Sequence, residues 1–97
     1  MSEYDIRHES DKSGSRFVID LGDGAEAELT YSRAGTERWI ADHTGVPSQH
    51  GGKGIASILV KALVAAAREA DVKIVPLCSY VRAWSIKHPA EADIFES

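Results

Sequence analysis

The sequence predicts an α+β fold, α/β-like in its second half, in which antiparallel strands are followed by a strand, a long helix, another strand and a terminal helix. Two observations carry this prediction. Apolar and polar residues alternate before residue 46, as in half-buried strands, and after residue 54 apolar residues recur every three or four positions, as on one helix face. We therefore expect a mixed sheet, antiparallel at first and then β-α-β-α.

About four strands are expected before Pro47. In residues 16–31, RFVIDLGDGAEAELTY, two alternating runs flank Gly-Asp-Gly, which is typical of a hairpin. The apolar positions that we expect on one face are Phe17, Ile19 and Leu21 in the first run and Ala25, Ala27, Leu29 and Tyr31 in the second. YDIRHE, residues 4–9, predicts an earlier strand, and SDKSGS, residues 10–15, is long enough only for a turn. ERWIADHTGV, residues 37–46, predicts a strand that ends at Pro47, which lacks a ladder donor.

The long helix is the clearest element. Its expected apolar stripe comprises Ile55, Ile58, Leu59, Ala62, Leu63, Ala66 and Ala70. VKIVPL, residues 72–77, then predicts a short buried strand, and YVRAWSIKH, residues 80–88, predicts a helix that ends at Pro89. Because a helix connects them, the strand before Pro47 and the strand at 72–75 are expected to be parallel neighbours.

Length and composition exclude several classes of protein. Residues 1–97 are expected to form one domain. The net charge of −4 disfavours nucleic acid and anionic membranes as partners. A single cysteine, Cys78, excludes an internal disulfide, and no apolar run reaches the roughly 20 residues of a membrane span. We expect a reduced, cytoplasmic protein without a metal site, because its Cys and His spacing provides no zinc-ligand set.

Glycines crowd the start of the long helix, in QHGGKGIAS at residues 49–57. A helix N-terminus has unpaired N–H groups and partial positive charge, and glycines allow an anion to approach it. Gly51, Gly52 and Gly54 would then hold a phosphate, with Lys53 adding charge. A flexible turn explains the same glycines, and neither a Walker A loop nor a dinucleotide-binding GxGxxG fits the spacing.

The order of strand, glycine turn, long helix, short strand and terminal helix resembles the core of the GNAT superfamily of acyl-CoA N-acyltransferases. HTGVP, GGKGIA, VPLC and KHP, between His43 and Pro89, make the chain similar to a small single-domain GNAT-like subfamily with the pattern HTxVP…GKGI…PLC…HP. The resemblance implies a GNAT-type mixed sheet in a minimal version. This version lacks the family's usual first two helices, because residues 10–15 leave no room for them.

In the GNAT family, backbone amides of the motif [QR]-x-x-G-x-[GA] cradle the coenzyme A pyrophosphate. The literal match is Gln49-x-x-Gly52-x-Gly54. We prefer Gly51-x-x-Gly54-x-Ala56. This register starts the helix where the apolar stripe begins and turns Ile55 inward.

The resemblance therefore implies acetyl-CoA (coenzyme A) as a bound small molecule, with Val46 offering backbone bonds to its pantetheine. The other implied contacts are Gly51, Gly52, Lys53, Gly54, Ile55 and Ala56.

Acyl transfer to an amine needs a base for the amine and a proton for the departing thiolate. His43 can act as the base, or can be a strand histidine bonded to a neighbour or to water. The acid common in HTEVP is absent, since Gly45 stands there. Cys78 can relay the acyl group, approach the coenzyme sulfur, or be a small buried residue. Trp84 aligns with the proton-donating tyrosine of larger relatives, which leaves Tyr80 as a substitute.

The sequence thus predicts an acetyl-CoA-dependent N-acetyltransferase whose amine acceptor, protein or small molecule, is not identified. Two alternatives stay open: a non-catalytic coenzyme A-binding module or sensor, and a small interaction domain with structural glycines. The acceptor-binding helices are missing, which leaves three explanations open. A second copy of the chain completes the site as a homodimer, the open cleft meets an exposed protein or peptide amine, or activity is slight.

Overall fold

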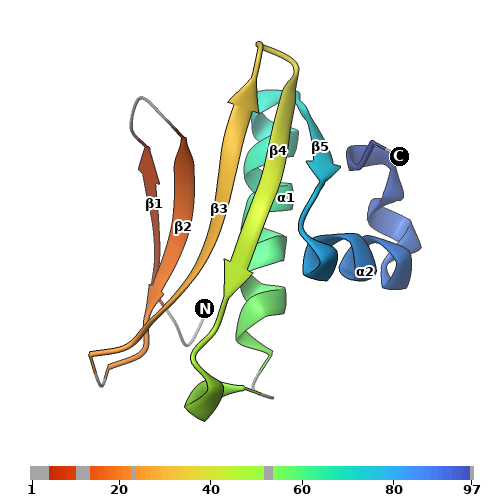
Figure 1. The fold of residues 1–97 in the computed structure, drawn as a ribbon. Coiled ribbons are helices and arrows are strands. Elements are labelled where there is room, and N and C mark those ends of the chain that lie inside the picture. The colour runs from red at the N-terminus through yellow and green to blue at the C-terminus, as the bar shows by residue number, and fades with distance from the viewer. Residues whose placement is uncertain (1–4, 11–13, 23, 52–53, 97) are drawn as a thin grey trace.

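The computed structural model describes residues 5–10, 14–22, 24–51 and 54–96. These residues form a five-stranded sheet in the order β1-β2-β3-β4-β5, with α1 across one face and α2 beside β5 (Figure 1). The elements are β1 Ile6–Ser10, β2 Ser15–Asp20, β3 Glu26–Ala34, β4 Arg38–Gly45, η1 Ser48–His50, α1 Ile55–Ala70, β5 Lys73–Pro76, α2 Ser79–Lys87 and η2 Pro89–Ile94. The predicted α+β element order is confirmed.

The sheet is antiparallel from β1 to β4 and parallel between β4 and β5. The predicted hairpin joins β2 to β3, whose last pair is Asp20 with Glu26. The predicted parallel pairing is also confirmed, with Arg38 opposite Lys73, because α1 carries the chain back across the sheet. The turn expected at 10–15 falls partly outside the described residues.

The core lies between the sheet and α1. The inward positions predicted from strand alternation are confirmed at Phe17, Ile19, Ala27, Leu29 and Tyr31, which are all buried. The buried residues of α1 are Ile55, Leu59, Val60, Leu63, Val64 and Ala67.

The predicted stripe on α1 was partly wrong. Ala70 is exposed, whereas Val60, Val64 and Ala67 are buried. The reason is that α1 packs on the C-terminal segment as well as on the sheet: Trp84 and Ile94 belong to the same buried cluster. A stripe inferred from α1 alone cannot show this second contact.

The other face of the sheet, here called the open face, is covered by no described helix. Its one fully buried residue among the β2 positions is Val18, which lies between Arg7 of β1 and Glu28 of β3. Ion pairs link the charged side chains of this face across the strands, at 2.7 Å for Arg16 with Glu9 and 2.9 Å for Arg16 with Glu28. The alkyl stems of these side chains shield Val18, and the charged ends face water.

The C-terminal segment closes the sheet edge at β5. The N–H of Glu96 donates to the Ile74 carbonyl at 2.8 Å, and Phe95 forms an isolated parallel bridge with Ile74. Arg68 of α1 donates to Asp93 at 2.9 Å and to Glu91 at 2.8 Å. These contacts hold η2 against the end of α1. Neither described helix has the length and apolar character of a membrane span.

The Arg68 contact predicts an acid-dependent loss of stability. Hydrogen bonds from Arg68 lower the pKa of the Asp93 carboxyl from its usual 3.8 to about 2. Because the folded-state pKa lies below the unfolded one, Asp93 stabilises the protein above pH 3.8 and loses this effect as the pH falls through about 2. The urea midpoint of Asp93→Asn should therefore lie below that of the wild type near neutral pH and converge with it in acid. The difference is small, since both side chains are exposed.

Glu69→Gln, at an exposed position of α1, is the matched control and should follow the wild type at every pH. A gap between Asp93→Asn and the wild type that stays constant through the acid range would show that the Arg68 contact does not act through the Asp93 charge.

Candidate functional site

Strands β4 and β5 diverge at the centre of the candidate site. Their recorded pairs run from Arg38 with Lys73 to Ala41 with Pro76. One further backbone bond follows, from the Cys78 N–H to the Ala41 carbonyl at 2.8 Å. The chain then turns into α2, while β4 continues to Gly45. The pairing of the two strands therefore ends at Ala41, before the end of β4 at Gly45, and an opening between them would begin at this point.

A β-bulge in β4 sets which side chains face this opening. Tyr31 pairs with Ala41 and Thr30 pairs with His43, so Asp42 is an extra residue on β4. The Asp42 carboxylate accepts a 2.5 Å hydrogen bond from Ser32. As bulges do, this one redirects side chains, and the consecutive residues Asp42 and His43 both point to the open face.

The His43 ring occupies space that a side chain at residue 45 would need. A Cβ placed on Gly45 would lie 3.1 Å from His43 Nε2, which is tighter than an ordinary contact. Among the recorded contacts of the His43 backbone, the carbonyl accepts from the Thr30 hydroxyl at 3.5 Å. The imidazole is exposed and lies where the missing acid of HTEVP would stand.

Cys78 is the N-cap of α2, and its thiol donates to Thr44 Oγ1 at 3.6 Å across the gap between the strands. Burial of the sulfur raises the pKa of the thiol, but hydrogen bonds that the thiolate form accepts from the Val81 backbone, the Thr44 hydroxyl and the Tyr80 backbone outweigh it. The pKa of Cys78 therefore lies below its usual 9.0. Donors at a helix N-terminus favour a thiolate for the same reason that they favour other anions.

The aromatic residues of α2 have different roles. The Tyr80 side chain is 39% exposed, and burial of its hydroxyl raises the pKa above the usual value, which keeps the phenol protonated near neutral pH. Trp84 is buried and donates its indole N–H to Ser57 Oγ at 3.0 Å, which joins α2 to α1. His88 is the C-cap of α2; its ring stacks on Trp84, and its Nδ1 lies 2.8 Å from the Trp84 carbonyl oxygen. Trp84 and His88 therefore support the fold.

The N-terminus of α1 lies beyond the end of β4. Helix α1 begins at Ile55, which is buried as the preferred motif register requires. Gly54 has φ 76°, a left-handed conformation that favours glycine, and no described side chain caps the helix or places an acid in its first turn. Among the described residues, no side chain therefore pairs with the N–H groups at the start of α1 as a cap. Gly52 and Lys53 lie outside the described residues.

Of the predicted site residues, the structure brings His43 and Cys78 to the point where β4 and β5 separate, and Val46 lies just beyond it. Gly51, Gly54 and Ala56 lie around the start of α1. In the residues that the structure describes, no group of three His, Cys, Asp or Glu side chains is placed to bind a metal.

Sequence reasoning missed Asp42 and Thr44. The signal was the run Asp-His-Thr, in which three consecutive polar residues interrupt the alternation expected of a half-buried strand. Such an interruption is typical of a bulge, although the sequence does not show which residue is extra.

Comparison with known proteins bears on the fold as a whole. The family model described as GCN5-related N-acetyl-transferase matches residues 16–94. Human Protein NATD1 is 33% identical over 85 residues, covering 87% of this chain and 75% of NATD1, and mouse Protein NATD1 is 33% identical with 77% of its length covered.

The similarity extends to a solved structure. A solution structure of a GCN5-like candidate N-acetyltransferase from Staphylococcus aureus matches with a TM-score of 0.76 and 33% identity, covering 100% of this chain and 92% of that one. This match confirms the expected GNAT-type mixed sheet.

The surroundings of Cys78 predict an acidic thiol. Titration of the thiolate by its ultraviolet absorbance should give a midpoint below 9.0, and Thr44→Val should raise that midpoint because one stabilising hydroxyl is lost. Cys78→Ser supplies the baseline, since the chain has one cysteine. A wild-type midpoint at or above 9.0 would mean that burial, and not the α2 N–H groups, dominates at the sulfur.

Proposed function

Because the chain belongs to the GCN5-related N-acetyltransferase family, we propose that residues 1–97 form a single acyl-CoA-binding domain that transfers an acetyl group from acetyl-CoA to an amine. The separation of β4 from β5 at Ala41 carries this proposal. It leaves an opening between two parallel strands, with Cys78 and His43 beside it and the start of α1 beyond. The acetyl-CoA thioester supplies the activated acyl group.

The coenzyme would be held at the start of α1. Residues 51–56 would present backbone N–H groups to its pyrophosphate, and Val46 would offer backbone bonds to pantetheine. The uncapped first turn and the absence of an acid among its described residues support this, because an anion there satisfies donors and meets a positive helix end.

His43 would be the general base. Its ring is exposed on the open face, next to the end of the β4–β5 pairing, and histidine is suited to proton transfer near neutral pH. Gly45 supports the assignment because any larger residue there would crowd His43 Nε2.

Acetyl transfer would take place in two steps, in which Cys78 is the nucleophile and Tyr80 the proton donor. The Cys78 thiolate attacks the thioester carbonyl, a new S–C bond forms as the coenzyme C–S bond breaks, and Tyr80 gives its proton to the coenzyme thiolate. The acceptor ammonium loses one proton to solvent, and the neutral amine attacks the cysteine-bound acetyl group as His43 takes its second proton. The N–C bond forms, the Cys78 thiolate leaves, and the proton on His43 returns through solvent to Tyr80.

Acetyl-CoA binding is tested by thermal unfolding. At about one hundred times its Kd, a ligand that binds only the folded state stabilises it by about 2.7 kcal/mol. Phosphopantetheine, which lacks the pyrophosphate, should give a much smaller shift.

Gly54→Ala should weaken acetyl-CoA binding, because its Cβ would stand among the proposed donors. Gly35→Ala is the matched control, since Gly35 has φ 71° and equally open surroundings in the β3–β4 turn. Both variants should lose about 1 kcal/mol of stability. No shift with millimolar acetyl-CoA, or equal loss of affinity in both variants, would overturn the proposed coenzyme site.

Catalysis is tested by mass spectrometry after incubation with acetyl-CoA and a panel of amines. A single acetyl adduct should form on Cys78 and be absent from Cys78→Ser. His43→Gln should form the same adduct and bind coenzyme normally, yet transfer acetyl to amines at least about 100-fold more slowly. Coenzyme binding without adduct or transfer would favour the alternative, a non-catalytic coenzyme A-binding module or sensor.

A further inference from the structure

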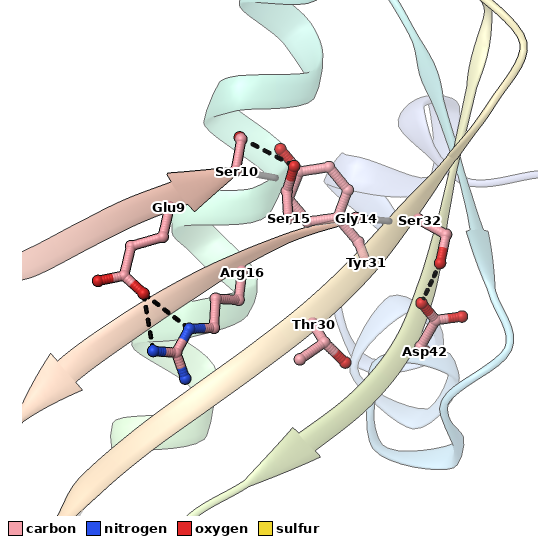
Figure 2. Close-up of a pocket in the computed structure, with 9 residues that line it drawn as sticks. All are labelled: Glu9, Ser10, Gly14, Ser15, Arg16, Thr30, Tyr31, Ser32 and Asp42. Atoms are coloured by element: carbon pink, nitrogen blue, oxygen red, sulfur yellow. Dashed lines mark hydrogen bonds and ion pairs between the residues drawn. The ribbon is translucent and has the colours of Figure 1, made fainter. Parts of the chain in front are cut away.

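A polar groove lies on the open face and is lined by residues of four strands, β1 to β4. Its volume is about 560 Å³, within the range of small-ligand sites. Figure 2 shows Glu9, Arg16, Thr30, Ser32 and Asp42 on the side of the sheet away from α1. The groove therefore occupies a surface that no described helix covers.

The charges of the groove do not cancel. Arg16 contacts Glu9 at 2.7 Å and also Glu28, just outside the groove, at 2.9 Å. Asp42, in contrast, meets a neutral group: among the recorded contacts of the described residues, its carboxylate accepts only from the Ser32 hydroxyl, at 2.5 Å. Asp42 is therefore a carboxylate of the groove that pairs with no cation among the recorded contacts of the described residues, and a cation would balance its charge.

The end of the groove at Asp42 is also the end nearest the proposed chemistry. Asp42 follows Ala41, whose carbonyl accepts the last backbone bond from Cys78, at 2.8 Å. His43 is the next residue, and the bulge places both side chains on the open face. A molecule bound against Asp42 would thus lie beside the proposed base and at the separation of β4 from β5.

We propose that this groove is the acceptor site and that Asp42 selects an alkylammonium group, the chemistry shared by a polyamine and a lysine side chain. This inference rests on the proposed function. The ammonium would donate to the free lone pairs of the Asp42 carboxylate, while Thr30 and Ser32 offer hydroxyls to the rest of the acceptor. An open groove on the sheet would take the place of the acceptor wall that two helices would otherwise build.

Asp42 is assigned to binding and not to proton transfer, because the acceptor nitrogen is positively charged both as the bound ammonium and as it attacks the acetyl carbon, so the attraction acts in both states. Asp42→Asn should therefore raise the KM for a cationic amine and leave kcat nearly unchanged. His43→Gln should lower kcat, so the two variants separate the two roles.

The direct test is an NMR titration of the full chain in the presence of coenzyme A, with two probes. Spermidine represents a small polyamine, and the tripeptide acetyl-Ala-Lys-Ala-amide represents a protein lysine. At least one should shift the amide signals of Thr30 and Ser32, and the same tripeptide with norleucine for lysine should not. Asp42→Asn should weaken binding by about tenfold, the loss expected for a hydrogen bond to a charged group.

Asp20→Asn is the control, because it changes the net charge equally at an exposed position of β2 outside the groove. Binding of either probe that Asp42→Asn weakens and Asp20→Asn does not supports the proposal, and the preferred probe identifies the source of the amine.

Equal weakening by both variants, or binding of neither probe, overturns the groove proposal. Stabilisation by acetyl-CoA would still leave the proposed function standing in that case. Probe binding at Asp42 without stabilisation by acetyl-CoA would instead remove the proposed function and leave a cation site.

Discussion

The hydrogen bond from the Cys78 N–H to the Ala41 carbonyl, 2.8 Å long, is the constraint on which the site depends. It joins β4 to the chain just after β5 and follows the last pair of the two strands, so it fixes where they separate. It also fixes where α2 begins, because Cys78 is the N-cap of that helix. One bond thus determines the position of the opening, the position of the sulfur, and the direction from which helix N–H groups approach that sulfur.

The arrangement on the two faces follows from the same sheet. One face is covered by α1 and holds the apolar core. The open face carries ion pairs around the buried Val18. Exposed ion pairs stabilise a fold weakly. Their role here is to make an uncovered sheet face soluble without helices, and this leaves room for a polar groove next to the separated strands.

Much of the fold could be predicted from the sequence, because it depends on local periodicity. Strand alternation identified Leu29 and Tyr31 as core residues, and the three- and four-residue spacing after Gly54 identified α1. The parallel pairing of β4 with β5 followed from the connecting helix. Val64 and Ala67 were missed because their burial depends on the returning C-terminal segment, a contact with no local signature.

The candidate site was less predictable for a related reason. A bulge is a relation between two strands, so the extra residue on β4 is known only once Tyr31 is seen opposite Ala41. For this reason His43 was recognised from sequence as a base candidate, and its neighbour Asp42 was not.

The glycine at position 45 gains a physical explanation from the same geometry. In the sequence, Gly45 stands at the position where HTEVP, the form of the pattern common in the subfamily that the chain resembles, has an acid. In three dimensions its missing Cβ leaves the space into which His43 Nε2 extends, 3.1 Å from where that Cβ would be. A side chain at 45 would require the exposed His43 ring to move slightly. The departure from the pattern therefore removes a carboxylate from β4 and lets the His43 ring lie against the backbone at residue 45.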